Sequence, residues 1–447
     1  MFKKLSRNPW IVFSPFLTYY AYVIVKNKWP TLYGDEIRYV DFAKNLTHGF
    51  YSPYPAHINL WSGPGYPLIL APFVAIHMPD LYMTMLNAIF QYLAVVFLYK
   101  ALRLITNYKT ALICGLLFAI YPNGLSMLPI LYTEALTCCL VSLFAYCVTI
   151  LYIKQGNQYI VLSGIVLGFL TLTKIILGYV IFICPLICLL LMLVSARKAN
   201  YIKSIKLFAV AIAICLPYLG YTYYITGKAF YWGNSGGMSL YWMSTPYEHE
   251  YGDWKLPALT NKQYPIMFIS PDVVVLLKKN HAKEINFILH HNEIQQDELF
   301  KQAAISNIKQ NPLKFGQNYL YNFSRMLFNF PYSYSYQDGA ILGNIIRGSL
   351  ILWLSVVGIV LTWVNWRRVI FPIKILLLVT GIYLLLSGIV SAFPRQLDVV
   401  VPVFLFWFGY LAVNVKKANF KFAEEELDNI QLTELNAMGV VTEDKDG

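Results

Sequence analysis

The sequence predicts an all-α polytopic membrane protein with about ten transmembrane helices, outer-face loops and a small, mainly helical outer region. Of its 447 residues, 57% are hydrophobic and only 13% are charged, whereas a soluble domain carries roughly a quarter charged residues. Apolar runs of about 20 residues, the length that crosses a bilayer, recur along most of the chain. The formal charge of +12 comes largely from basic clusters between these runs. Such clusters are typical of cytoplasmic loops and argue against a nucleic-acid partner.

The apolar runs between the basic clusters give the positions of the spans. The expected spans lie near residues 10–25, 81–99, 110–122, 133–153, 158–194 (as two helices), 207–225, 346–364, 371–390 and 399–415. The block at 158–194 is too long for one span but just long enough for a tight helical hairpin at about 1.5 Å per residue. Its midpoint, Lys174, should therefore lie near the outer face.

This order of spans predicts a multi-pass protein of the plasma (bacterial inner) membrane with both chain ends in the cytoplasm. The first apolar stretch has no small-residue cleavage site, so we expect a retained helix and no cleaved signal peptide. The expected parts are an N-terminal transmembrane module at 1–225 with its first outer loop at 29–80, an outer region at 226–345, C-terminal transmembrane helices at 346–417, and an acidic cytoplasmic tail at 418–447.

Apolar residues at helical spacing also occur inside the outer region, from Asp297 to Phe330. The pattern is broken at Asn311-Pro312, and Pro312 fits the start of a second helix, where no backbone N–H is needed. The acidic tail is predicted to be a short helix followed by disorder. All seven cysteines fall inside apolar runs, which argues against a disulfide framework.

An acidic pair, Asp35-Glu36, stands just beyond the first span with Arg38 beside it. Charged groups are expensive at the membrane interface, so such a cluster is a functional-site candidate. Apolar residues recur at i+3 from Ile37 to Leu46, which predicts a short amphipathic helix along the membrane surface with Asp35 at its N-cap. The structural alternative is that Asp35 only caps this helix, but a cap needs one acceptor and no ion cluster.

Three further charged residues are predicted at the same face. Glu134 opens the fourth span, where a helix N-terminus favours a carboxylate for structural reasons alone. Lys174 stands in apolar sequence and needs a counter-anion, which could be Glu134, a lipid headgroup or a substrate phosphate. Arg395 lies in the last outer turn and offers a planar fork of donors suited to a phosphate. The alternative for this arginine is an exposed ion pair with Asp398.

Trp61-Ser62-Gly63-Pro64-Gly65-Tyr66-Pro67 is interpreted as a rigid turn with its aromatic residues in the interfacial belt, although these rings could also stack on a sugar. Asn87 and Gln91 are interpreted as interhelical hydrogen-bonding residues. The histidines show no convincing metal-ligand spacing, so no metal site is predicted.

One acidic cluster and two or three cations at an outer face fit one reaction well. A sugar carried on a polyprenyl phosphate leaves behind a phosphate monoester, which needs cationic stabilisation but no general acid. The acceptor hydroxyl needs a single carboxylate to take its proton. A glycoside hydrolase, in contrast, uses two carboxylates because its leaving group is poor.

The ordered motifs resemble those of the membrane GT-C glycosyltransferases, which include protein O-mannosyltransferases and the lipid A aminoarabinose transferases. The resemblance covers most of residues 10–415. It rests on Asp35-Glu36-x-Arg38-Tyr39, Pro64-Gly65-Tyr66-Pro67, Tyr132-Thr133-Glu134, Leu172-Thr173-Lys174, Asn234-Ser235-Gly236-Gly237, Asn311-Pro312, and Pro394-Arg395 followed by Pro402. The aminoarabinose transferases place a lysine and a double proline where this chain has Ser62-Gly63-Pro64-Gly65, so that particular donor and acceptor are not implied.

The resemblance implies an inverting transfer at the outer face, metal-independent or weakly metal-dependent and without a cofactor. The donor would be a polyprenyl-phosphate-linked sugar, and the acceptor a glycan, lipid or protein. The roles expected on this basis are catalysis for Asp35 and Glu36, donor phosphate binding for Arg395, Lys174 and Arg38, and substrate positioning for Glu134, Tyr66 and Tyr39. Two alternatives remain open: a lipid-linked sugar flippase or secondary transporter, and a glycan ligase or polymerase that uses a pyrophosphate-linked donor.

Overall fold

A computed structural model describes residues 8–54, 57–154, 156–195, 197–256, 271–334, 341–390 and 392–415. The predicted acidic tail lies outside the described residues. Every regular element in the described part of the chain is a helix. The prediction of an all-α architecture is therefore confirmed.

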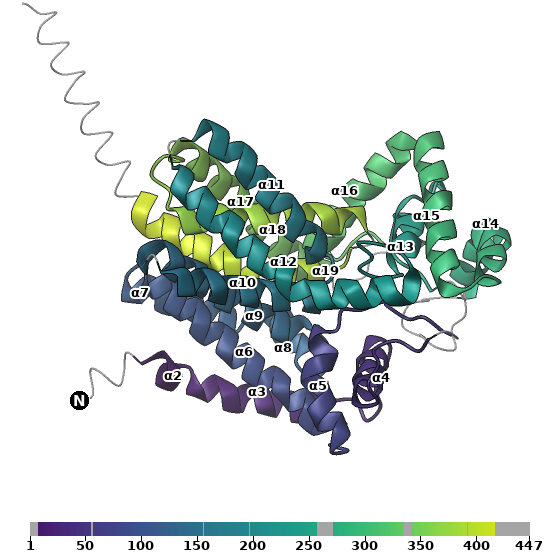
Figure 1. Ribbon diagram of the computed structural model, residues 1–447, viewed down its shortest axis with the longest axis horizontal. Helices are drawn as coiled ribbons and strands as arrows, with labels where there is room; N and C mark the ends of the chain where they lie inside the picture. Colours follow the sequence, from purple (N-terminus) through teal and green to yellow (C-terminus); the bar gives the residue numbers. More distant parts are fainter. Residues whose placement is uncertain are drawn as a thin grey trace, which may run out of the picture.

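A bundle of apolar helices forms most of the molecule (Figure 1). In the part of the chain that the structure describes, six helices are long and apolar enough to cross a membrane: α6 (Asp80–Arg103), α9 (Glu134–Lys154), α11 (Leu177–Val194), α12 (Lys198–Thr226), α17 (Ile341–Val364) and α18 (Phe371–Ile389). Four shorter apolar helices accompany them among the described residues: α5 (Gly65–Ala75), α7 (Tyr108–Ala119), α10 (Asn157–Thr173) and the last described helix, Val401–Val415. The polytopic membrane class predicted from the apolar runs is confirmed.

The predicted hairpin at 158–194 is present as α10 and α11, with Lys174 at the turn between them. Two other expectations differ from the structure. The first predicted span is divided at Phe13 into α2 (Pro9–Val12) and α3 (Ser14–Asn27). Pro15 has no backbone N–H, so it fits the first turn of a new helix better than the interior of one. Residues 65–75, placed in the outer loop, form the helix α5, and Pro67 lies in its first turn.

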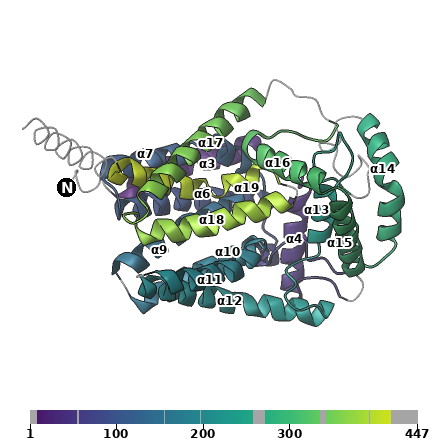
Figure 2. The same ribbon diagram turned by 90° about the horizontal axis from the view of Figure 1, so that it is seen from above.

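In the described part of the chain, four helices gather beyond one end of the bundle, within the residues that the sequence analysis expects to form an outer region (Figures 1 and 2). They are α13 (Gly236–Met243), α14 (Pro271–Leu289), α15 (Glu293–Gln310) and α16 (Pro312–Phe328). Pro312 starts α16, as predicted. The region has a small core of its own, to which Trp242, Leu277 and Phe300 contribute.

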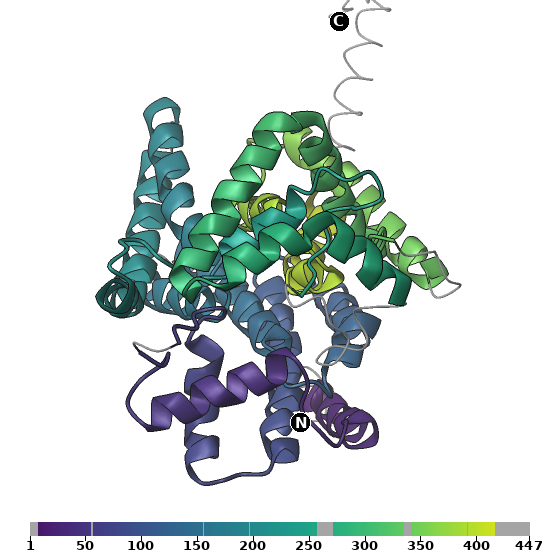
Figure 3. The ribbon, with the colours of Figure 1, turned by 90° about the vertical axis from the view of Figure 1, so that its right-hand side faces the viewer.

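The predicted surface helix is α4 (Asp35–Thr47). It lies across the same end of the bundle, transverse to the long helices, and is the dark purple helix in the view onto that end (Figures 2 and 3). Its buried face includes Tyr39, Val40, Phe42 and Ala43, and it packs against α5. Two short helices, α8 (Pro122–Met127) and α19 (Pro394–Asp398), pack against each other.

Candidate functional site

Asp35 is the first residue of α4, and its carboxylate holds two arginines. Oδ1 accepts a hydrogen bond from Arg38 one turn along α4. Oδ2 accepts from Nη1 of Arg395 at 3.0 Å, across from α19. Gly34 occupies the predicted N-cap position of Asp35, with a φ of 57° that glycine adopts without strain. The Asp35 carboxylate therefore serves an ion cluster and is not the helix cap.

The charge state of Asp35 follows from this setting. Burial raises the pKa of its carboxyl, but Arg395 and Arg38 lower it by more, so the pKa lies below its ordinary value of 3.8. The side chain is 21% exposed. A charged carboxylate is thus held at a position that solvent or a ligand can still reach.

Lys174 and Glu134 form a second ion pair in the same cluster. Nζ of Lys174 donates to Oε1 of Glu134 at 3.0 Å. Glu134 begins α9 and is 5% exposed, where the N-terminal helix dipole favours its negative charge. Glu134 is therefore the counter-anion that Lys174 was predicted to need. Lys174 also lowers the pKa of Asp35, which places both ion pairs in one electrostatic unit.

Arg395 is supplied to the site by the short helix α19. Its guanidinium carbon lies 5.5 Å from the centre of the Tyr132 ring. Asp398 does not pair with Arg395, contrary to the alternative considered from the sequence. Its carboxylate accepts a hydrogen bond from the Tyr121 hydroxyl at 2.5 Å and lies 3.6 Å from Nη1 of Arg347. Arg395 therefore forms its ion pair with Asp35.

Glu36 makes a different set of contacts from those of its neighbour. It forms an ion pair with Lys28 at 2.8 Å and accepts hydrogen bonds from the backbone N–H groups of Leu131 at 2.8 Å and Tyr33 at 3.1 Å. These bonds tie α4 to the segment that leads into α9. Glu36 therefore connects α4 to the segment before α9 and fixes their relative position.

Tyr39 and Tyr66, predicted to position the substrate, are both buried. Their rings meet edge to face with centres 5.3 Å apart. The Tyr66 hydroxyl lies 3.5 Å from the side-chain oxygen of Asn87, and the Asn87 amide donates to the carbonyls of Leu128 and Ile130. The two tyrosines pack on the buried side of α4. Asn87 connects α6 to the segment before α9 by hydrogen bonds.

The Trp61–Pro67 motif brings a loop close to both ion pairs. The Trp61 ring lies 5.1 Å from the guanidinium carbon of Arg38, a cation–π distance. Gly63 and Gly65 pack directly on the backbone of Leu172 and Thr173, and a Cβ atom at either glycine would overlap it. Only glycine allows this loop to approach the residues that precede Lys174 so closely.

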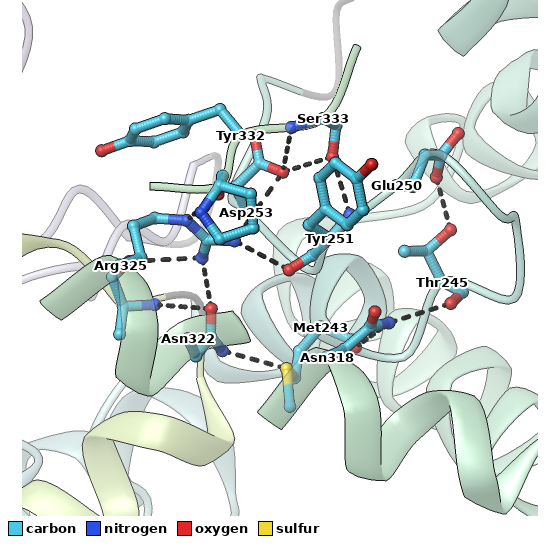
Figure 4. A network of polar contacts seen from close by, with 12 residues as sticks. Met243, Thr245, Glu250, Tyr251, Asp253, Asn318, Asn322, Arg325, Tyr332 and Ser333 are labelled. Atoms are coloured by element: carbon cyan, nitrogen blue, oxygen red, sulfur yellow. Dashed lines mark hydrogen bonds and ion pairs between the residues drawn. The ribbon is translucent and has the colours of Figure 1, made fainter. Parts of the chain in front are cut away.

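Helix α16 fixes the segment that precedes α19 through Asn322 and Arg325, two of the residues labelled in Figure 4. The Asn322 amide donates to the carbonyls of Gly388 and Val390, at 3.0 Å and 3.1 Å. Arg325 is fully buried, and its guanidinium donates to the Ala392 carbonyl at 3.4 Å. Asn322 and Arg325 therefore hold the chain three to seven residues before Arg395.

The same helix reaches into the outer region. Arg325 donates to the backbone carbonyls of Tyr251 and Pro331, at 2.7 Å and 2.8 Å. Asn318 donates to the carbonyls of Met243 and Thr245. Asn318, Asn322 and Arg325 were not singled out from the sequence, although their i, i+4, i+7 spacing places them on one helix face. That polar stripe on a helix that also has an apolar face was the available signal.

The fold and this cluster define an all-helical membrane protein with a candidate anion-binding site at one end of its bundle. Residues 62–221 match the family model described as dolichyl-phosphate-mannose-protein mannosyltransferase. The matched segment contains Glu134 and Lys174, while Asp35 and Arg395 lie outside it. The resemblance to the membrane GT-C glycosyltransferases is thereby confirmed for this segment. No curated protein matches the chain.

The chain is also similar to solved structures, which include the following two. The oligosaccharyltransferase AglB from Archaeoglobus fulgidus, in complex with an inhibitory peptide and a dolichol-phosphate, has a TM-score of 0.49 and 14% identity, over 97% of this chain and 52% of that chain. ArnT from Cupriavidus metallidurans, bound to undecaprenyl phosphate, has a TM-score of 0.38 and 12% identity, over 89% of this chain and 77% of that chain. The chain thus spans about half the length of the archaeal enzyme.

Proposed function

We propose that the protein is an integral membrane glycosyltransferase. It moves a sugar from a polyprenyl-phosphate donor to a hydroxyl of a glycan, lipid or protein acceptor at the outer face of the plasma membrane. The observation that carries this proposal is the ion pair between Asp35 and Arg395, which places a charged carboxylate and a guanidinium together in one partly exposed cluster. The family match over residues 62–221 supports a donor carried on a lipid phosphate.

The charge of the cluster suits an anionic donor. Arg38, Arg395 and Lys174 contribute three positive charges, and Asp35 and Glu134 contribute two negative charges. The remainder is one net positive charge. A guanidinium fork binds a phosphate through two parallel hydrogen bonds, so Arg395 can exchange its bond to Asp35 for bonds to the donor phosphate.

This exchange would couple donor binding to activation of the base. When the phosphate takes Arg395, Asp35 is released from one of its two cations and becomes free to accept the proton of an acceptor hydroxyl. The acceptor oxygen attacks the anomeric carbon from the face opposite the phosphate. The bond between that carbon and the phosphate oxygen breaks, its electron pair stays on the phosphate, and polyprenyl phosphate leaves. A single displacement of this kind inverts the anomeric carbon.

The other members of the cluster are assigned supporting roles. Glu134 holds Lys174 toward the donor phosphate, and Arg38 fixes the second oxygen of Asp35. Glu36 supports catalysis by fastening α4 to the segment before α9. Tyr39 and Tyr66 would position the substrate by fixing the buried side of α4, because both rings are buried in the present arrangement.

The acceptor would enter through a cavity of about 340 Å³ between the Trp61 loop and α15. Asn59, Asn234 and Gln296 are among its lining residues, and Trp61 joins it to the Arg38 side of the cluster. Carboxamides and an aromatic wall suit a hydroxyl-rich acceptor. Gln296→Ala should raise the KM for the acceptor and leave the donor Kd unchanged, and an effect on the donor alone would contradict this assignment.

The direct test is sugar transfer in proteoliposomes that contain a pool of polyprenyl-phosphate sugars and candidate acceptors. We expect wild-type protein to release polyprenyl phosphate together with glycosylated product, and Asp35→Asn to abolish both. Asp41→Asn is the matched control, because Asp41 lies on the same helix with 56% of its side chain exposed. Equal turnover by wild type and Asp35→Asn would remove Asp35 from the mechanism. Movement of lipid-linked sugar between leaflets without transfer would favour a flippase.

A further inference from the structure

Trp61 contacts the ion cluster through Arg38. The Trp61 ring lies 5.1 Å from the guanidinium carbon of Arg38, and Arg38 in turn donates to Oδ1 of Asp35. The Arg38 side chain is only 18% exposed, and cation–π contacts are strongest where water is excluded. Nε of Arg38 is buried and makes no hydrogen bond to the described residues. The indole ring and the Asp35 carboxylate therefore hold this guanidinium together.

The backbone on both sides of Trp61 is fixed by hydrogen bonds from other parts of the chain. The N–H of Leu60 donates to the side-chain oxygen of Asn234 at 2.9 Å. The carbonyl of Ser62 accepts from the hydroxyl of Tyr51 at 2.7 Å. The loop therefore holds its shape, and the indole can move only through its own side-chain torsions. Such a preorganised ring is suited to fixing a neighbouring side chain.

A second tryptophan, Trp254, supports Trp61 from the outer region. The two rings meet edge to face with centres 6.2 Å apart, and both are partly buried against the core of that region. Trp254 follows Asp253, whose carboxylate pairs with Lys255 at 2.7 Å and accepts from the backbone N–H of Ser333 at 2.9 Å (Figure 4). Trp61 thus rests on an anchored part of the outer region.

Trp61 also lines the cavity of about 340 Å³ proposed above for the acceptor. One side chain therefore borders both this cavity and the cation that holds Oδ1 of Asp35. We infer that Trp61 is a positioning residue, which holds Arg38 on Asp35 and so fixes the base beside the bound acceptor. This inference rests on the proposed function, because it takes Asp35 as the base of the transfer.

The need for such a residue follows from the exchange at Arg395. When the donor phosphate takes Arg395, Oδ2 of Asp35 loses its partner, and Arg38 is the arginine that still holds the carboxylate through Oδ1. Because the Trp61 ring fixes Arg38, Oδ1 stays anchored and Oδ2 is presented to the acceptor hydroxyl. A displacement of a catalytic group by about 1 Å can cost on the order of a hundredfold in rate.

Initial rates at saturating donor, with the acceptor varied, separate kcat from the acceptor KM. Trp61→Leu should lower kcat roughly tenfold through loss of the shielded cation–π contact, and should raise the acceptor KM because a cavity wall is lost. Trp61→Phe keeps an aromatic face and should recover most of kcat. Trp254→Leu is the matched control and should leave kcat unchanged. Both tryptophans pack on the same core, but only Trp61 of the two lies over Arg38.

The Arg38→Gln background distinguishes positioning from packing. In this background Trp61→Leu should still raise the acceptor KM but should lower kcat no further, because the cation that it positions is gone. A packing role would lower kcat in either background. Fluorinated tryptophan at position 61 keeps the size of the ring and weakens its attraction for a cation. The value of kcat should therefore fall with each added fluorine, even if Trp61→Leu fails to fold.

The contrary results separate this inference from the proposed function. If wild type transfers sugar, then an unchanged kcat in folded Trp61→Leu, or an equal loss of kcat in Trp254→Leu, would overturn the role of Trp61 alone. A kcat that is insensitive to fluorination would do the same. A wild-type protein that transfers no sugar would refute the proposed function and this inference together.

Discussion

Nη1 of Arg395 lies 3.0 Å from Oδ2 of Asp35, although 360 residues separate them in the chain. Helix α4, which begins at Asp35, and helix α19, which carries Arg395, thus meet through one ion pair. Both partners are partly exposed, at 32% and 21% of their side chains. An ion pair at such a position adds little stability, so its placement is better explained by a ligand that competes for one partner.

The competition between Asp35 and a phosphate predicts the effect of removing Arg395. Arg395→Ala should weaken the binding of a polyprenyl-phosphate sugar by about ten- to a hundredfold, the equivalent of one hydrogen bond to a charged group. Arg395→Lys should recover part of the loss, since it restores the charge without the planar fork. Equilibrium binding in detergent measures both, with Arg103→Ala as control. Unchanged donor affinity in Arg395→Ala would remove this residue from the donor site.

The lowered pKa of Asp35 predicts the pH profile of the free enzyme. Because its folded pKa lies below 3.8, the carboxylate is already ionised at every pH above about 5. The profile of kcat/KM reports groups of the free enzyme, so it should show no acidic limb from Asp35 between pH 5 and 8. Measurement of kcat/KM against pH tests this. An acidic limb near pH 6 that shifts in Asp35→Glu would contradict the proposed charge state.

The ion pair between the half-buried Lys174 and the buried Glu134 predicts a strong energetic coupling. Lys174→Met alone leaves the Glu134 carboxylate buried without its cation, which should cost about 3–5 kcal/mol of stability. The double variant Lys174→Met/Glu134→Gln should lose clearly less than the sum of the single changes. Thermal unfolding of the four proteins in one detergent measures the coupling. Additive losses would show that the two side chains do not interact.

Most of the architecture could be predicted from the sequence because hydrocarbon imposes long apolar runs. Apolar length located the long helices and the hairpin at Lys174, whereas local chemistry overrode it at Pro15 and at α5. The candidate site was predicted only as a set of residues at one face. Which charges pair depends on three-dimensional proximity, and for this reason Asp398 was wrongly considered as a partner for Arg395. Asn322 and Arg325 were missed because many of their partners are backbone carbonyls, which the side-chain sequence does not mark.

The contacts of Asn322 predict a positioning effect on Arg395. Asn322→Ala leaves the carbonyls of Gly388 and Val390 without this donor, at a cost of about 1–3 kcal/mol for each buried group left unpaired. The segment before α19 should loosen, so the donor Kd should rise while the acceptor KM stays unchanged. Gln317→Ala is the control, because Gln317 is exposed on the same helix. A loss of stability with unchanged donor affinity would limit Asn322 to a structural role.

The buried carboxyl of Asp398 predicts a stability that falls as pH rises. Burial raises the pKa of Asp398 to about 6 from its ordinary value of 3.8, against the lowering by Tyr121, Arg347 and Asn123. The folded state therefore binds this proton more tightly than the unfolded state, and the free energy of unfolding falls as pH rises from about 4 to 6. The difference of about 2.2 pH units corresponds to about 3 kcal/mol.

Asp398→Asn carries no titrating proton and keeps an acceptor for the Tyr121 hydroxyl. Relative to wild type, this variant should therefore gain stability progressively between pH 4 and 6, with no further change above about pH 7. Thermal unfolding of both proteins across pH 4–8 measures the difference, and Asp41→Asn supplies an exposed acid as control. A wild-type protein that becomes more stable relative to Asp398→Asn as pH rises would mean that Arg347 holds the carboxylate charged and that burial does not dominate its titration.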